Sequence, residues 1–293
     1  MKKLTPKPFL KWVGGKTNLL KDLDSHLPKE IKNNKPFVYV EPFLGGGAMF
    51  FHLLNNYKIE KAYLNDINKK LIGVYTDIKD NVEPLISMLK KLESEYFNIK
   101  LEEEKKELYL KKRTLFNSLK QSVEKSALLI FLNKTSFNGM YRENQKGEFN
   151  IPFGKMNPKV ICNEALLKKL SLSFKNVVFS SKSFEDLLVK KSETPVFYYL
   201  DPPYRPISET SSFKSYSSEN DFDDSLQKKL CGFCDDVNKL NNWFMQSNSF
   251  SEDGFFQKLY KNYNINNVNI IRTIAADGAK RVGVQEILIT NYE

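Results

Sequence analysis

The chain of 293 residues is long enough for one large domain or two modest ones, and its 41% hydrophobic and 27% charged residues are ordinary for a globular protein. It contains no apolar segment of membrane-spanning length and no signal peptide, so we expect a cytoplasmic protein. Three cysteines do not suggest a disulfide framework, and the net charge of +10 favours a polyanionic partner such as nucleic acid.

The first motif, KPFLKWVGGKT at residues 7–17, ends like a phosphate-binding loop of nucleotide triphosphatases. That loop needs a glycine where Leu10 stands and a preceding strand, and the sequence offers neither. A different ligand must therefore account for Gly14 and Gly15 between Trp12 and Lys16.

Residues 36–54 predict a buried strand, a glycine-rich turn and the start of a helix. Gly45 and Gly47 match the first two glycines of a dinucleotide-binding turn, but Phe50 replaces the third. This difference argues against NAD as the ligand and leaves open a nucleoside ligand that has no phosphates. Asp66 lies 21 residues beyond Gly45, in an acidic turn at the end of the next predicted strand, where a carboxylate can accept hydrogen bonds from both ribose hydroxyls. A turn of purely structural importance is the alternative.

From about residue 81 to 132 the sequence predicts long charged helices, followed at 138–155 by turn-and-hairpin spacing. Strands return after about residue 166, at 176–181, 195–204, 243–249, 268–275 and 284–292. This order predicts an α/β sheet interrupted by an inserted, mostly helical module. Cys231 and Cys234 form a lone C-x-x-C on a helical apolar stripe, without the further ligands of a zinc site, so we expect no metal.

The segment VFYYLDPPY, residues 196–204, is an apolar strand that ends in Asp201. Two prolines stop the strand, so that the Asp201 carboxylate and the Pro202 carbonyl can converge beyond the sheet and hold both hydrogens of an exocyclic amine. Tyr204 offers a ring on which a flipped base can stack. An ordinary strand-ending turn is the alternative.

Six segments together resemble the Dam-type (D12 class, alpha-group) DNA adenine-N6 methyltransferases: FLKWVGGK, EPFLGGG, LNDIN, FNGMYRENQKGEFNIPFGK, DPPYRPISETSSF and RTIAADGAKR. The resemblance covers nearly the whole chain, with the motifs in the family's order. It implies a Rossmann-like S-adenosylmethionine-dependent methyltransferase sheet, formed by residues 1–73 and 166–293, with a target-recognition domain at 74–165. The implied activity is methyl transfer from S-adenosylmethionine to N6 of a flipped adenine in duplex DNA.

The same resemblance assigns residues to three roles. The cofactor would be bound by Trp12, Lys16, Glu41, Pro42, Gly45, Gly47, Asp66, Phe184 and Asp201. The catalytic motif would be Asp201, Pro202, Pro203 and Tyr204. The DNA-probing hairpin would use Arg142, Asn144, Gln145 and Lys146.

The chain departs from the family pattern at three positions. Many relatives have Asp where Ser183 stands, and members with a GATC target often have an aromatic residue at Glu143 and Arg at Lys146. GATC is nevertheless the first expectation. RNA adenine methylation, DNA cytosine-N4 methylation and a catalytically silent DNA-binding module are the alternatives. We expect a monomer associated with the nucleoid, and leave open a cognate restriction endonuclease.

Overall fold

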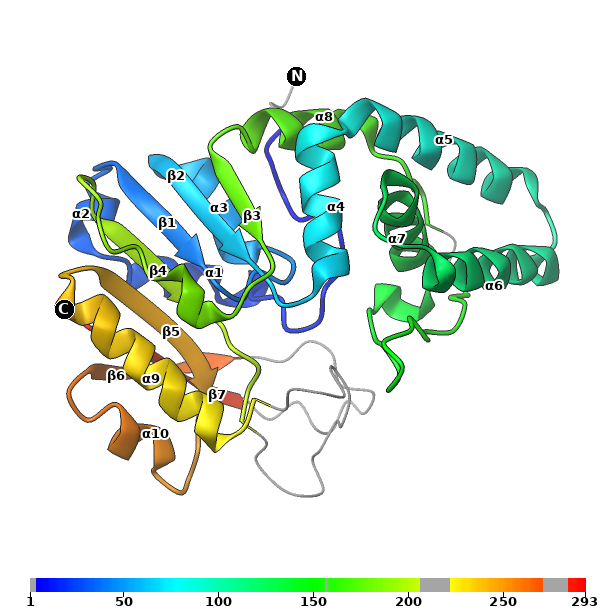
Figure 1. The fold of residues 1–293 in the computed structure, drawn as a ribbon. Helices are drawn as coiled ribbons and strands as arrows, with labels where there is room; N and C mark the ends of the chain where they lie inside the picture. The colour runs from blue at the N-terminus through cyan, green and yellow to red at the C-terminus, as the bar shows by residue number, and fades with distance from the viewer. Residues whose placement is uncertain (1–3, 156–157, 206–221, 271–283) are drawn as a thin grey trace.

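The computed structural model describes residues 4–155, 158–205, 222–270 and 284–293. A seven-stranded sheet with the order β3-β2-β1-β4-β5-β7-β6 lies at its centre (Figure 1). The strands are β1 (Phe37–Glu41), β2 (Ile59–Asn65), β3 (Val177–Ser180), β4 (Val196–Leu200), β5 (Trp243–Ser249), β6 (Asn264–Ile270) and β7 (Val284–Thr290). Strands β1 to β5 pair in parallel, whereas β7 is antiparallel to both β5 and β6.

The sheet is covered on both faces, and its central strands β1 and β4 are apolar except for Glu41 at the end of β1. In β1, Phe37 and Tyr39 face one core, and Val38 and Val40 face the other, as the two-residue period of a strand requires. The first core is closed mainly by the helices α1 (Leu20–Ser25), α2 (Lys29–Lys32), α3 (Ala48–Asn56) and α4 (Lys69–Asp80). The second is closed by α9 (Asp224–Lys239) and α10 (Phe255–Leu259).

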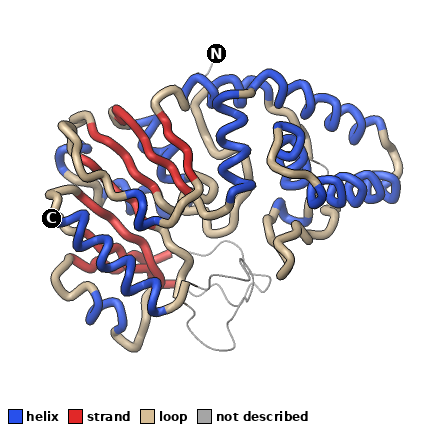
Figure 2. Tube along the Cα trace, in the orientation of Figure 1, coloured by secondary structure: helices blue, strands red, loops and turns tan. Residues whose placement is uncertain are grey.

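A helical module lies beyond the β3 edge of the sheet (Figures 1 and 2). It consists of α5 (Val82–Asn98), α6 (Glu102–Ser118) and α7 (Val123–Thr135), and α7 packs against α4, α5 and α6. The chain returns to the sheet through α8 (Glu164–Ser173). The predicted domain boundaries at 73/74 and 165/166 fall inside α4 and α8, and the division itself stays a prediction.

The structure confirms the predicted α/β class and the positions of the strands. Strand β6 differs, since it begins at Asn264 rather than at residue 268. Residues 272–281, which carry the RTIAADGAKR motif, and the DPPY segment from Pro206 onward lie outside the described residues. Among the helices that are described, none is long and apolar enough to cross a membrane.

Candidate active site

The strand order reverses between β1 and β4, which are neighbours in the sheet although they are distant in sequence. In open α/β sheets, ligands bind outside the carboxyl ends of the strands at such a reversal. Glu41 is the last residue of β1 and Asp201 directly follows β4. The sequence has therefore placed two carboxyls at this end of the sheet.

The Asp201 carboxylate is held by two side chains from other segments. Lys16 Nζ lies 3.0 Å from Asp201 Oδ1, and Ser247 Oγ on β5 donates a hydrogen bond to the same oxygen at 3.1 Å. Burial raises the pKa of the Asp201 carboxyl, while the Lys16 ammonium and the Ser247 hydroxyl oppose that rise. The two partners thus favour the ionised form of this acid, which burial disfavours.

The rest of the DPPY turn is anchored at both ends. Pro202 is buried and Pro203 is exposed, and the Tyr204 ring lies under Lys16, with Nζ 4.4 Å from the ring centroid. Arg205 then ties the end of the turn to α9 through Asp224, with an Nε–Oδ1 distance of 2.5 Å. Because proline also restricts the backbone, Asp201 and Tyr204 project from a rigid turn.

The glycine-rich turn after β1 is closed by Asp66. Gly45 N–H donates to Asp66 Oδ2 at 2.8 Å, and Asn68 N–H donates to Asp66 Oδ1 at 2.9 Å. Burial raises the pKa of the Asp66 carboxyl and these two amides oppose the rise. Gly45 has φ of +49°, and a Cβ there would lie 3.0 Å from Cδ1 of Trp12. Trp12 therefore packs directly on the turn, as close as a glycine permits.

The carboxyl of Glu41 lies in a buried environment of its own. The Tyr39 hydroxyl donates to Glu41 Oε2 at 2.9 Å, and burial raises the pKa of Glu41 well above its ordinary value. The next residue, Pro42, is fixed by Asn65, whose side-chain amide donates to the Pro42 carbonyl at 3.0 Å. The end of β1 is thus shaped by a residue at the end of β2.

Phe184 is the first residue of a 3-10 turn, η3 (Phe184–Leu187). It belongs to the second core, on the face of the sheet that carries Val38 and Val40 of β1. Its ring packs on Phe43 and Phe222, with centroid distances of 5.7 and 6.1 Å, and it is 7% exposed. Ser183 Oγ donates to Glu185 at 3.2 Å in an exposed position. Ser183 thus makes a contact within its own turn.

In the predicted DNA-probing segment, residues 141–155, the part from 141 to 150, called here the recognition hairpin, closes on Asn144. Asn144 Oδ1 accepts from the N–H groups of Lys146 and Glu148, both at 3.0 Å, and Asn144 Nδ2 donates to Glu148 Oε2 at 2.9 Å. These bonds use the side chain of Asn144 to shape the turn. A role for Asn144 in contacting bases stays a prediction.

The other three predicted DNA-contacting residues are arranged differently. Gln145 and Lys146 are exposed at the hairpin tip, while Arg142 is half-buried and its Nε donates to Asn150 Oδ1 at 2.8 Å. The tip therefore presents a positive charge and an amide to solvent, and Arg142 braces the two sides of the hairpin.

Three contributors to the site were missed from the sequence. Tyr141 stacks on Trp12, with centroids 4.7 Å apart and planes inclined by 22°. Ser247 bonds Asp201, and Glu286 on β7 lies 3.9 Å from Lys16 Nζ. Tyr141 was at least within the hairpin motif, whereas Ser247 and Glu286 belong to strands without a motif, so only the sheet order reveals them.

Comparison with known proteins places this geometry in context. Residues 12–274 match the family described as D12 class N6 adenine-specific DNA methyltransferase. The chain is 44% identical to the Type II methyltransferase M.MjaIII of Methanocaldococcus jannaschii, over 98% of the chain and 99% of that protein. It is 35% identical to the Type II methyltransferase M1.LlaDCHI of Lactococcus lactis, over 99% and 97%, and 30% identical to the DNA adenine methylase of Escherichia coli, over 96% and 93%.

Proposed function

The chain belongs to the D12 class of N6 adenine-specific DNA methyltransferases, and from this premise we propose how its residues divide the work. It is a site-specific DNA adenine methyltransferase, with duplex DNA as its substrate. We propose that S-adenosylmethionine is the methyl donor and that the adenine is flipped out of the duplex. The observation that carries the proposal is the partly buried Asp201 carboxylate at the sheet reversal, held by Lys16 and Ser247.

The residues around the glycine turn fit this cofactor. The turn carries no side chain at Gly45, and we propose that the adjoining indole of Trp12, which stacks on Tyr141, attracts the sulfonium through its π system. Asp66 uses one lone pair of each oxygen for a backbone amide, which leaves further acceptor capacity for ribose hydroxyls. We assign the methionine end to Trp12 and Lys16 and the ribose to Asp66. Glu41, Pro42 and Gly47 shape the turn, and Phe184 packs near the adenine.

When bound, S-adenosylmethionine supplies a methyl group on a positively charged sulfur, so the protein need only prepare the accepting nitrogen. The lone pair of adenine N6 is delocalised into the ring, which makes it a poor nucleophile. The Asp201 carboxylate and the Pro202 carbonyl accept its two hydrogens and draw the nitrogen towards sp³ geometry. As the bond from N6 to the methyl carbon forms, the bond from that carbon to the sulfonium sulfur would break and leave a neutral thioether. Asp201 would stabilise the cationic nitrogen until one N6 proton passes to solvent.

The flipped base would stack on Tyr204, and Pro203 keeps the turn rigid. For the target we propose GATC as the first sequence to test, with Arg142, Asn144, Gln145 and Lys146 of the hairpin closest to the base edges. We further propose a monomer that acts on nucleoid DNA in the cytoplasm. We leave open a cognate restriction endonuclease, which would be sought among the neighbouring genes.

The decisive experiment expresses the chain in a host that lacks DNA methylation and reads the host DNA by single-molecule sequencing. This measurement gives both the modified base and its sequence context. The Asp201→Ala variant is the control and should leave the DNA unmodified. Methylation at cytosine N4, or none with the wild-type chain, would contradict the proposal, and adenine methylation outside GATC would correct only the target.

A further inference from the structure

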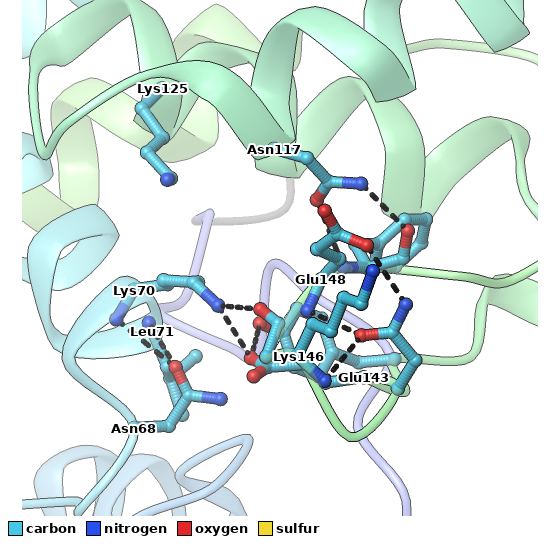
Figure 3. A network of polar contacts seen from close by, with 12 residues as sticks. Asn68, Lys70, Leu71, Asn117, Lys125, Glu143, Lys146 and Glu148 are labelled. Atoms are coloured by element: carbon cyan, nitrogen blue, oxygen red, sulfur yellow. Dashed lines mark hydrogen bonds and ion pairs between the residues drawn. The ribbon is translucent and has the colours of Figure 1, made fainter.

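The recognition hairpin is tied to the helix that follows the Asp66 turn. Lys70, in the first turn of α4, lies with Nζ 3.1 Å from Glu143 Oε1, and the same ammonium donates to the Gly147 carbonyl at 2.5 Å (Figure 3). Glu143 also accepts a hydrogen bond from the Tyr141 hydroxyl. One lysine side chain thus holds the hairpin at two points.

The position of Lys70 is in turn fixed by the turn around Asp66. Asn68 caps α4, because its Oδ1 accepts from the N–H groups of Lys70 and Leu71 at 3.0 and 3.1 Å, and its own N–H bonds Asp66. The backbone between Asp66 and Lys70 is therefore rigid. Lys70 is thus linked to the Asp66 turn through Asn68.

The hairpin base is attached separately to the helical module. Asn117 on α6 donates from Nδ2 to the Phe149 carbonyl at 3.1 Å and accepts from Phe149 N–H at 2.9 Å. The hairpin thus spans two supports, one on α6 and one on α4. The direction of its tip depends on both.

We propose that Lys70 and Glu143 are a positioning pair that sets the angle of the hairpin tip against the DNA, and so determines sequence discrimination from outside the base-contacting surface. The inference rests on the proposed function of the hairpin. Charge explains why the pair is needed: phosphates repel a carboxylate, and a Glu143 without a cation would be driven away from the DNA. The Lys70 and Glu143 side chains are 26% and 20% exposed, so solvent screens their attraction only in part.

The test measures kcat/KM on the target site found by sequencing and on its single-base variants, at one fixed salt concentration. Lys70→Met and Glu143→Gln should each lower discrimination by about tenfold or more, because small misplacements of a contacting group have effects of that size. Lys70→Arg keeps the charge and should retain most of the discrimination. Affinity for S-adenosylmethionine and thermal stability are measured on each variant to establish that it is folded.

Lys69→Met is the matched control, because it removes the same charge from an exposed position in the same helical turn. Unchanged discrimination in folded Lys70→Met would overturn the inference. A change with Glu143→Gln alone would mean that Glu143 contacts a base directly, and an equal change with Lys69→Met would assign the effect to net charge. Failure of the proposed function is distinguishable, since the wild-type chain would then methylate no adenine.

Discussion

Replacement of Lys16 by methionine tests whether Asp201 of the DPPY turn needs the Lys16 ammonium in order to stay ionised. The ammonium lies 3.0 Å from Asp201, and the two side chains are 9% and 19% exposed. At this separation the Coulomb attraction is about 5 kcal/mol with an effective dielectric constant of 20. Desolvation offsets part of it, and hydrogen bonds to charged groups contribute about 1.5–3 kcal/mol net. We therefore expect kcat at neutral pH to fall about ten- to a hundredfold, with cofactor and DNA saturating.

The pH dependence of kcat shows in which direction the loss of Lys16 shifts the pKa of Asp201. Burial already raises the pKa of Asp201, and Lys16 opposes that rise, so its removal raises the pKa further. On the proposed mechanism the ionised carboxylate stabilises the developing cationic nitrogen and the neutral acid does not, so activity should be lost as the pH falls through this pKa. The acid limb of the kcat profile of Lys16→Met should move to higher pH, and activity should recover as the pH is raised.

The alternative role of Lys16 predicts a different result. If Lys16 paired only with the carboxylate of the cofactor, Lys16→Met would raise the KM for S-adenosylmethionine and leave the acid limb of kcat in place. That outcome would refute the argument. Lys16→Arg, which keeps the charge, should have an acid limb close to that of the wild type.

Three further predictions concern the other parts of the site. Asp201→Ala should abolish turnover and leave cofactor affinity largely intact, whereas Asp66→Ala should weaken the cofactor by about 1–3 kcal/mol; equal losses in calorimetry would contradict the division of roles. Gly45→Ala should destabilise the protein by about 1–3 kcal/mol in thermal denaturation, because φ at Gly45 is +49° and a Cβ would lie 3.0 Å from the Trp12 indole. The control Gly232→Ala should be neutral or stabilising in the same measurement, because a Cβ there would meet nothing within 4 Å. Lys146→Ala should reduce discrimination at one base pair by about 1–3 kcal/mol, whereas Lys35→Ala should change only the salt dependence; uniform loss across variant sites would assign Lys146 to a phosphate.

The strands were predictable because a buried parallel strand is an apolar run, as in β1 and β4. The start of β6 was not, since Asn264, Asn266 and Asn267 have low strand propensity. Tertiary pairing overrides that propensity, because each of these residues pairs with β7. Local composition therefore predicts central strands better than edge strands.

The site was predictable where both partners of an interaction follow neighbouring strands, and hidden where segments that are distant in sequence meet. Asp66 could be expected beside the glycine turn because both follow neighbouring strands. The contacts of Lys16 with Asp201 and of Trp12 with Tyr141 join segments that are far apart in sequence. Asn144 shows a further limit of prediction from sequence. Its residue type is the same whether its amide shapes a turn or contacts a base, so only the structure shows that it shapes the turn.

The charges at the carboxyl ends of the strands suggest why such a site suits a cationic methyl donor. Burial raises the pKa values of Glu41, Asp66 and Asp201, so each of these acids is harder to ionise than in water. Lys16 compensates Asp201 directly, at 3.0 Å. A sulfonium among the same acids would favour their ionised forms by the same attraction, and by linkage these forms would favour the sulfonium over its neutral thioether product. If S-adenosylmethionine binds here as proposed, acids whose ionisation burial disfavours would hold the charged donor more tightly than its uncharged product.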